Sequence, residues 1–110
     1  MTDKIVVLVT SGKREEAEQL ANRLVELRLA ACVSIIPNVA SFYWWEGKVT
    51  RDDEFLLIIK TSRPRFEAVR KEVQRLHSYI VPEIIALPIV EGSEEYLNWI
   101  DESLSKKGET

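Results

Sequence analysis

A strand-like apolar run followed by an amphipathic helical pattern occurs twice in this chain, and this repetition constrains the fold more than any other feature. Residues 5–9 form a continuous β-branched and leucine run, which is typical of a central strand buried on both faces. From Lys13 the apolar residues recur with helical spacing, so we expect a helix that Ser11 caps and that runs to about Leu29. The first half is therefore a strand and a helix.

Residues 31–45 and 48–61 predict a long β-hairpin in the middle of the chain. The first segment is rich in Val, Ile, Ser and aromatic residues, and the turn falls at Gly47. Pro37 interrupts the first strand, where we expect a bulge or bend because proline cannot donate to a strand ladder.

The second half repeats the helix and the strand and adds one more helix. Pro64 is expected in the first turn of a second helix, and residues 84–87 in a last strand. Ser93 is expected to cap a C-terminal helix. The residues of that helix expected to face inward are Tyr96, Leu97, Trp99, Ile100 and Leu104.

The order β-α-β-β-α-β plus a C-terminal helix predicts an α+β fold of the ferredoxin-like type, a split βαβ sandwich. Its antiparallel sheet should carry both long helices on one face. A chain of 110 residues has the size of one domain, which we take to span residues 1–110.

The predicted third strand is apolar on both faces, which indicates self-association. Phe55, Leu57 and Ile59 lie on one face, and Leu56 and Ile58 on the other. The C-terminal helix is too narrow to cover four strands, and large exposed apolar patches usually mark interfaces. We therefore expect a second copy of the chain to cover the face without helices.

The tip of the hairpin carries four consecutive aromatic residues, Phe42, Tyr43, Trp44 and Trp45. They point alternately to both faces of the strand, and aromatic side chains are common anchors of interfaces. We expect Tyr43, Trp44 and Trp45 at a subunit interface; the alternative is that two of the four rings cap the core of their own domain.

Composition excludes several classes of protein. The 15 basic and 18 acidic residues are interspersed, so no basic face for nucleic acid is expected. No apolar run approaches the length of about 18 residues that spans a membrane, and the five apolar residues before Thr10 are too few for a signal peptide. The single cysteine, Cys32, is expected in the core and suits a reducing, intracellular location.

Several residues are candidates for a site, each with an ordinary structural alternative. His77, the one histidine, is either a functional residue, as a metal ligand or a proton carrier, or simply a helix-terminating residue. Glu54 belongs to an acidic run that is either solvated or faces a cleft, and Lys60 is an ion-pair partner or an anion binder. A metal site needs three or four ligands, so it must draw on carboxylates or on other subunits. No signature of an enzyme is present.

Four segments in order, with a terminal fifth, resemble the CutA family, the divalent-cation tolerance proteins. They are Leu24-Val25 leading to Leu29-Ala30-Ala31-Cys32-Val33, Ser41-x-Tyr43-x-Trp45-x-Gly47, residues 56–61, His77-x-Tyr79-x-Val81-Pro82-Glu83-Ile84-Ile85 with Leu87-Pro88-Ile89, and Tyr96-Leu97-x-Trp99-Ile100.

This resemblance implies a ferredoxin-like protomer, a compact homotrimer with hairpins pairing across subunits, cytoplasmic location, and a link to tolerance of copper and other divalent cations. In some members, copper binding is attributed to the histidine of the His-x-Tyr motif and a cysteine near the first helix. His77 matches the histidine, whereas Thr10, Ser11 and Gly12 stand where the cysteine would be.

Three functional hypotheses follow. The first is a non-enzymatic, trimeric tolerance protein with no obligatory cofactor, which binds copper(II) or another divalent cation weakly at clefts between subunits through His77, Glu54 and Glu83. The second is a trimeric signalling protein that binds a small anionic effector through Lys60, Tyr79 and Trp45. The third, an RNA-binding module, is disfavoured because residues 53–57 are acidic and then apolar.

Overall fold

The computed structural model describes residues 2–105, and the expected order of elements is confirmed. The elements are β1 (Lys4–Ser11), α1 (Arg14–Glu26), β2 (Cys32–Trp45), β3 (Lys48–Ser62), the 3-10 turn η1 (Arg63–Arg65), α2 (Phe66–Leu76), β4 (Ile84–Pro88) and α3 (Glu94–Leu104).

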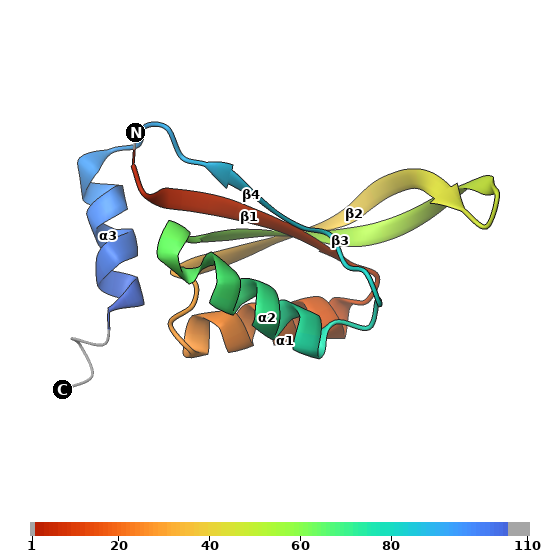
Figure 1. Ribbon diagram of the computed structural model, residues 1–110, viewed down its shortest axis with the longest axis horizontal. Coiled ribbons are helices and arrows are strands. Elements are labelled where there is room, and N and C mark those ends of the chain that lie inside the picture. The colour runs from red at the N-terminus through yellow and green to blue at the C-terminus, as the bar shows by residue number, and fades with distance from the viewer. Residues whose placement is uncertain (1, 106–110) are drawn as a thin grey trace.

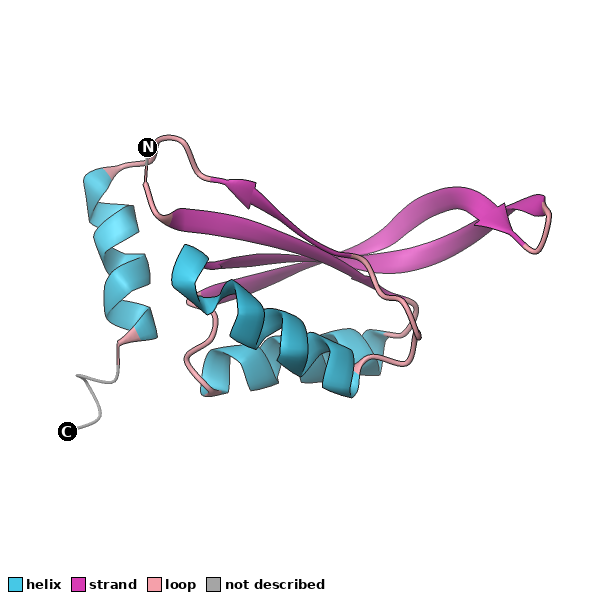
Figure 2. Cartoon of the chain, viewed as in Figure 1, coloured by secondary structure: helices cyan, strands magenta, loops and turns pink. Residues whose placement is uncertain are grey.

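The four strands form one antiparallel sheet in the order β2-β3-β1-β4, as the split βαβ arrangement requires. Helices α1 and α2 lie together on one face of this sheet, and α3 stands at one end (Figure 1). Figure 2 shows the other face without a long helix across it.

The core lies between the sheet and the two long helices. Alternate residues of the central strands point into it and are fully buried: Val7, Val9, Leu57 and Ile59. The helices contribute Leu20, Leu24, Val69 and Val73, which recur at helical spacing on one face of each helix. Burying each large side chain contributes about 1.5–3 kcal/mol, so this layer stabilises the sandwich.

The hairpin formed by β2 and β3 projects well beyond the body of the domain (Figure 1). Its ladder shifts register between Ile36 and Val39, which confirms the bulge expected at Pro37. Glu46 and Gly47 adopt positive φ angles in the turn. Close to the tip, Trp44 is 73% exposed in the single chain.

Three expected details of the helices are wrong. Helix α1 ends at Glu26, because Arg28 adopts a left-handed backbone with φ of 62° and turns the chain toward β2. Ser11 belongs to β1 and does not cap α1, and Pro64 lies in η1 before α2 begins.

Helix α3 packs on the domain through a stripe of apolar residues that begins at Leu97. The cap by Ser93 is confirmed, since its hydroxyl accepts from the Tyr96 amide at 3.2 Å. Ile100 is buried against Ala31, but Tyr96 and Trp99 do not face inward as expected. Their rings stack on each other with centroids 5.4 Å apart and are partly exposed.

The face of the sheet opposite α1 and α2 remains incompletely covered in one protomer, and we call it the helix-free face. Leu56 and Ile58 are half-buried there. Ile36, Ile85 and Leu87 are exposed, Leu87 to 51%. Within residues 2–105, no helix is both long enough and apolar enough to cross a membrane.

Candidate functional site

The candidate site lies where the loop of residues 77–83, between α2 and β4, packs against the turn from β1 to α1. Both segments meet at the end of the sandwich from which the hairpin projects (Figure 1). The helix α2 ends because His77 adopts an extended backbone, with φ of −78° and ψ of 142°. The chain then carries Tyr79 and Glu83 past the end of β1 before it enters β4.

His77 is buried, and both of its ring nitrogens are occupied. Nε2 lies 2.7 Å from the carbonyl oxygen of Thr10, which can only accept, so this nitrogen carries the proton. Nδ1 accepts from the backbone amide of Tyr79 at 3.0 Å. In this geometry the imidazole anchors the loop to β1 and offers no free lone pair to a metal.

Glu16 connects the two segments from the side of α1. Its Oε2 accepts from the hydroxyl of Ser11 at 2.7 Å, and its Oε1 accepts from the amide of Ser78 at 2.9 Å. Burial acts to raise the pKa of Glu16, but the hydrogen bonds from Ser11 and Ser78 outweigh burial and lower it. Glu16 is therefore ionised at neutral pH.

Tyr79 donates its hydroxyl proton to Oε2 of Glu54 at 2.9 Å. Burial and this carboxylate raise the pKa of Tyr79 far above its usual range, so the phenol stays protonated. Glu54 is only 7% exposed. A Cβ placed on Gly12 would lie 2.9 Å from the Tyr79 hydroxyl, so a residue without a side chain is needed beside the ring.

Glu83 adds a second carboxylate near Glu54. Desolvation and the negative charge of Glu54 both raise the pKa of Glu83. Further along β3, Asp52 accepts a hydrogen bond from the hydroxyl of Tyr43. This end of the molecule therefore concentrates carboxylates whose mutual repulsion a bound cation would relieve.

The predicted metal ligands do not form a complete site in one protomer. The imidazole of His77 faces Thr10, whereas the carboxylate of Glu54 faces Tyr79. Among residues 2–105, no three side chains of His, Cys, Asp or Glu gather closely enough to hold a metal ion. Additional ligands would be needed, and the hypothesis of a site at clefts between subunits assigns them to a neighbouring copy of the chain.

The predicted effector residues lie in three different places within one protomer. Lys60 is six residues beyond Glu54 on β3, or about 20 Å at the rise of a strand. Its Nζ lies 5.9 Å from the centroid of the Tyr96 ring. Trp45 is at the hairpin tip and Tyr79 in the loop. The effector hypothesis therefore needs neighbouring subunits and stays a prediction.

Cys32 is not in the core, contrary to expectation. It lies on the helix-free face at the start of β2 and is partly exposed. Its sulfur is 3.9 Å from Nζ of Lys60. The strand alternates between faces, and this position falls on the face opposite Val33 and Ile35, which are partly buried against the core.

Sequence reasoning missed Glu16 and Gly12. A signal for Glu16 was present, because it precedes Leu20 and Leu24 at intervals of four residues and thus shares their buried face. The role of Gly12 depends on the approach of Tyr79, which is 67 residues away in sequence and has no local signal.

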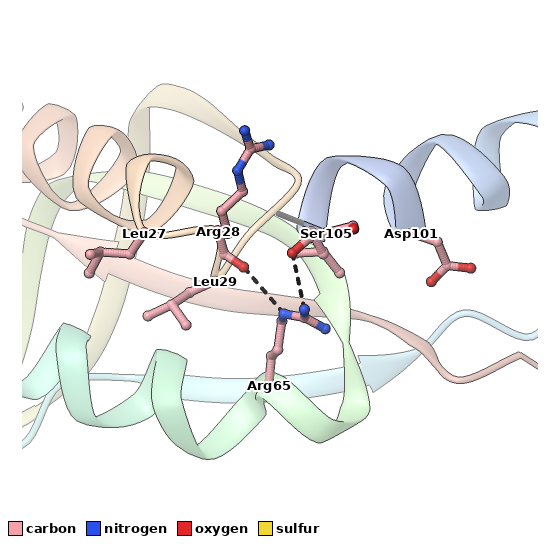
Figure 3. Close-up of a pocket in the computed structure, with 7 residues that line it drawn as sticks. Leu27, Arg28, Leu29, Arg65, Asp101 and Ser105 are labelled. Atoms are coloured by element: carbon pink, nitrogen blue, oxygen red, sulfur yellow. Dashed lines mark hydrogen bonds between the residues drawn. The ribbon is translucent and has the colours of Figure 1, made fainter. Parts of the chain in front are cut away.

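A depression of about 590 Å³ lies at the opposite end, between the C-terminal ends of α1 and α3 and the turn η1 (Figure 3). Arg65 lines this depression, and its guanidinium donates to the carbonyl of Arg28 at 3.2 Å and to that of Leu104 at 3.0 Å. The Leu104 carbonyl belongs to the C-terminal end of α3, where the helix dipole is negative, whereas the Arg28 carbonyl lies in the turn that follows α1. Arg65 therefore fastens α3 to the sandwich, and this depression is separate from the candidate site.

Comparison with known proteins gives consistent matches over nearly the whole chain. A family model described as CutA1 divalent ion tolerance protein matches residues 5–103. The "Divalent-cation tolerance protein CutA" of Thermus thermophilus is 50% identical over 98 residues, which cover 89% of this chain and 95% of that protein.

Two further proteins extend this likeness. The "Protein CutA, chloroplastic" of Arabidopsis thaliana is 52% identical over 99 residues, 90% of this chain and 54% of that longer protein. The solved structure of the "Periplasmic divalent cation tolerance protein CutA" from Archaeoglobus fulgidus matches with a TM-score of 0.90 and 47% identity, covering 93% of this chain and 99% of that chain. The sequence comparison and the structure comparison therefore match this chain to the same proteins over nearly its whole length.

Proposed function

The chain belongs to the CutA1 divalent ion tolerance protein family, and from this membership we propose that it serves metal tolerance by binding divalent cations without catalysing a reaction. The names of its relatives support the role in tolerance. Binding at the loop of residues 77–83 is our proposal for how this chain performs that role.

The observation that carries the proposal is the pair of carboxylates Glu54 and Glu83. Glu54 is buried and Glu83 has a raised pKa because of desolvation and of the charge on Glu54. A divalent cation between them would replace repulsion by attraction. Carboxylate oxygens accept many divalent cations, and copper(II) binds most tightly to a given ligand set, so copper(II) is the cation to test.

His77 is the third proposed ligand, and its present bonds give a reason for weak binding. To coordinate a cation, the ring must leave the Thr10 carbonyl or the Tyr79 amide. Each lost hydrogen bond costs about 1 kcal/mol, which subtracts from the affinity.

We propose that the remaining ligands come from neighbouring subunits of a homotrimer. Support comes from exposed apolar residues on the helix-free face, Ile36, Ile85 and Leu87, and from the aromatic hairpin tip. The two edge strands, β2 and β4, also leave backbone groups available for pairing with another chain.

We propose a cytoplasmic location for this protein. The support is the single cysteine, which forms no disulfide within the chain. Relatives are named for other compartments, chloroplastic in Arabidopsis thaliana and periplasmic in Archaeoglobus fulgidus, so location must be tested in the source cell.

Native mass spectrometry with copper(II) tests both binding and assembly. We expect a trimer that carries copper in multiples of three, and loss of copper from the trimer of Glu54→Gln/Glu83→Gln. The matched control is Glu95→Gln/Glu102→Gln, which removes two exposed carboxylates of α3 and should keep copper.

A trimer that binds no copper would refute the cation site and leave the assembly intact, whereas a monomer would refute the assembly. His77→Gln tests the imidazole separately, because the glutamine amide can still donate to Thr10. We expect this variant to keep its fold and bind copper more weakly.

A further inference from the structure

We propose that Glu16 is a positioning residue that locks the loop of residues 77–83 in place and thereby holds Tyr79 and Glu83 beside Glu54. This inference rests on the proposed function, because the loop carries the proposed cation ligands. Glu16 forms hydrogen bonds with Ser11 and Ser78, so it acts on the carboxylates of Glu54 and Glu83 through the loop.

Glu16 forms hydrogen bonds with two parts of the chain that are far apart in sequence. One carboxylate oxygen accepts from the Ser11 hydroxyl at the end of β1, and the other accepts from the Ser78 amide in the loop. Ser78 is 62 residues from Glu16 in sequence. A carboxylate with one oxygen on each segment fixes their relative position, and charge assistance makes both bonds stronger than neutral ones.

The loop depends on such polar contacts because its apolar side chains do not hold it. Ile80 is 97% exposed and Val81 87% exposed, so neither packs on the domain. The loop is tied to other segments by hydrogen bonds of the His77 ring with Thr10, the Ser78 amide with Glu16, and the Tyr79 hydroxyl with Glu54. The hydrogen bond with Glu16 holds Ser78, which lies between His77 and Tyr79 in the sequence.

Truncation of Glu16 would leave the Ser78 amide without its partner, and the Ser11 hydroxyl would keep only its contacts with the backbone of Lys13. The segment between His77 and Tyr79 could then shift, and the phenol of Tyr79 with it. Loss of a group that orients metal ligands typically weakens metal binding about 10- to 100-fold. A glutamine at this position keeps one carbonyl oxygen for the Ser78 amide, so Glu16→Gln should preserve much of the arrangement.

The test measures hydrogen exchange of the loop and copper(II) binding on the same full-length variants. In Glu16→Ala we expect faster amide exchange within residues 77–83, unchanged exchange in β1 and β3, and copper(II) affinity lowered about 10- to 100-fold. Glu16→Gln should restore slow exchange in the loop. Glu15→Ala is the matched control, since Glu15 is the exposed neighbour in the same turn, and it should change neither measurement.

Two results would overturn the proposal: unchanged loop exchange in Glu16→Ala, or exchange raised throughout the chain in both Glu16→Ala and Glu16→Gln. The exchange measurement needs no metal. If the wild type binds no copper(II) but Glu16→Ala frees the loop, the positioning role stands and the proposed cation function fails.

Discussion

At the scale of single residues, the contact between Gly12 and Tyr79 yields a sharp prediction. Gly12→Ala places a methyl group 2.9 Å from the Tyr79 hydroxyl, and overpacking of this kind costs about 1–3 kcal/mol. The strain should vanish in Gly12→Ala/Tyr79→Phe, because the next ring atom is 3.8 Å away. Urea unfolding of the two single variants and the double variant measures this coupling, and additive free energies of unfolding would contradict it.

Glu83 gives a prediction for pH dependence. Its pKa is raised in the folded state, so the folded protein binds its proton more tightly than the unfolded chain does. This contribution to stability is complete below the unfolded pKa, about 4.3, and is lost as pH rises through the folded pKa. Glu83→Gln should therefore gain stability over the wild type at pH 7, by a few tenths of a kcal/mol after screening by solvent.

The measurement for Glu83 is the free energy of unfolding of both proteins at pH 4 and pH 7. We expect the difference between Glu83→Gln and wild type to grow with pH. An equal difference at both values would show that neither burial nor the charge of Glu54 raises the pKa of Glu83 in the folded protein.

Two residues of the site were predictable from the sequence, His77 from its residue type and Glu54 from its position beside a buried segment. His77 is the one histidine of the chain and begins the loop of residues 77–83. Glu54, an acidic residue next to a buried segment, lies on β3 and contacts that loop through the hydroxyl of Tyr79. The partners of His77 and Glu16 were not predictable, because Thr10 and Ser78 contribute backbone atoms that only the fold brings near these side chains. Every residue has a backbone carbonyl, and all except proline have an amide, so residue type does not reveal which of these groups binds a side chain.

At the scale of secondary-structure elements, Arg65 is expected to control the docking of α3. Arg65→Met removes its hydrogen bonds to the carbonyls of Arg28 and Leu104 while keeping the aliphatic stem. Loss of hydrogen bonds to a charged group should cost about 2 kcal/mol and speed amide exchange in α3.

The control for Arg65 is Arg70→Met, which removes an ion pair with Glu67 on the surface of α2. Such pairs contribute about 0.2–1 kcal/mol, so this variant should leave α3 protected from exchange. Equal exchange of α3 in the two variants would mean that Ile100 and Leu104 hold this helix without Arg65.

The elements themselves could be predicted because their signals are local. Pro37 indicated the bulge and Ser93 the cap of α3, and both follow from the chemistry of one residue. The end of α1 could not be predicted, since Arg28 adopts a left-handed backbone that glycine or asparagine would have signalled. The exposure of Tyr96 also escaped prediction, because α3 packs at one end of the sheet and not across it.

At the scale of the whole molecule, the helix-free face should determine assembly. Leu87 lies on this face in the edge strand β4 and is half-exposed in one protomer, so Leu87→Lys should leave the protomer folded and disrupt the oligomer. Light scattering after size-exclusion chromatography measures the mass. Glu67→Lys, on the exposed surface of α2, is the control and should remain assembled. An oligomer of unchanged mass in Leu87→Lys would exclude this face as the interface.

Assembly and cation binding should be coupled, because the carboxylates of one protomer do not complete a metal site within residues 2–105. If neighbouring subunits supply the missing ligands, dilution below the dissociation constant of the oligomer should release copper(II) from the wild type. Copper(II) should in turn raise the midpoint of thermal unfolding, since a ligand that binds only the assembled state stabilises it.

Two variants separate the causes of this coupling. Glu54→Gln/Glu83→Gln should stay assembled without copper(II), whereas Leu87→Lys should lose copper(II) although Glu54 and Glu83 are intact. A monomeric Leu87→Lys that binds copper(II) as tightly as the wild type would place the whole site within one chain. The loop of residues 77–83 would then have to bring His77 to the carboxylates by a rearrangement of its hydrogen bonds to Thr10 and Tyr79.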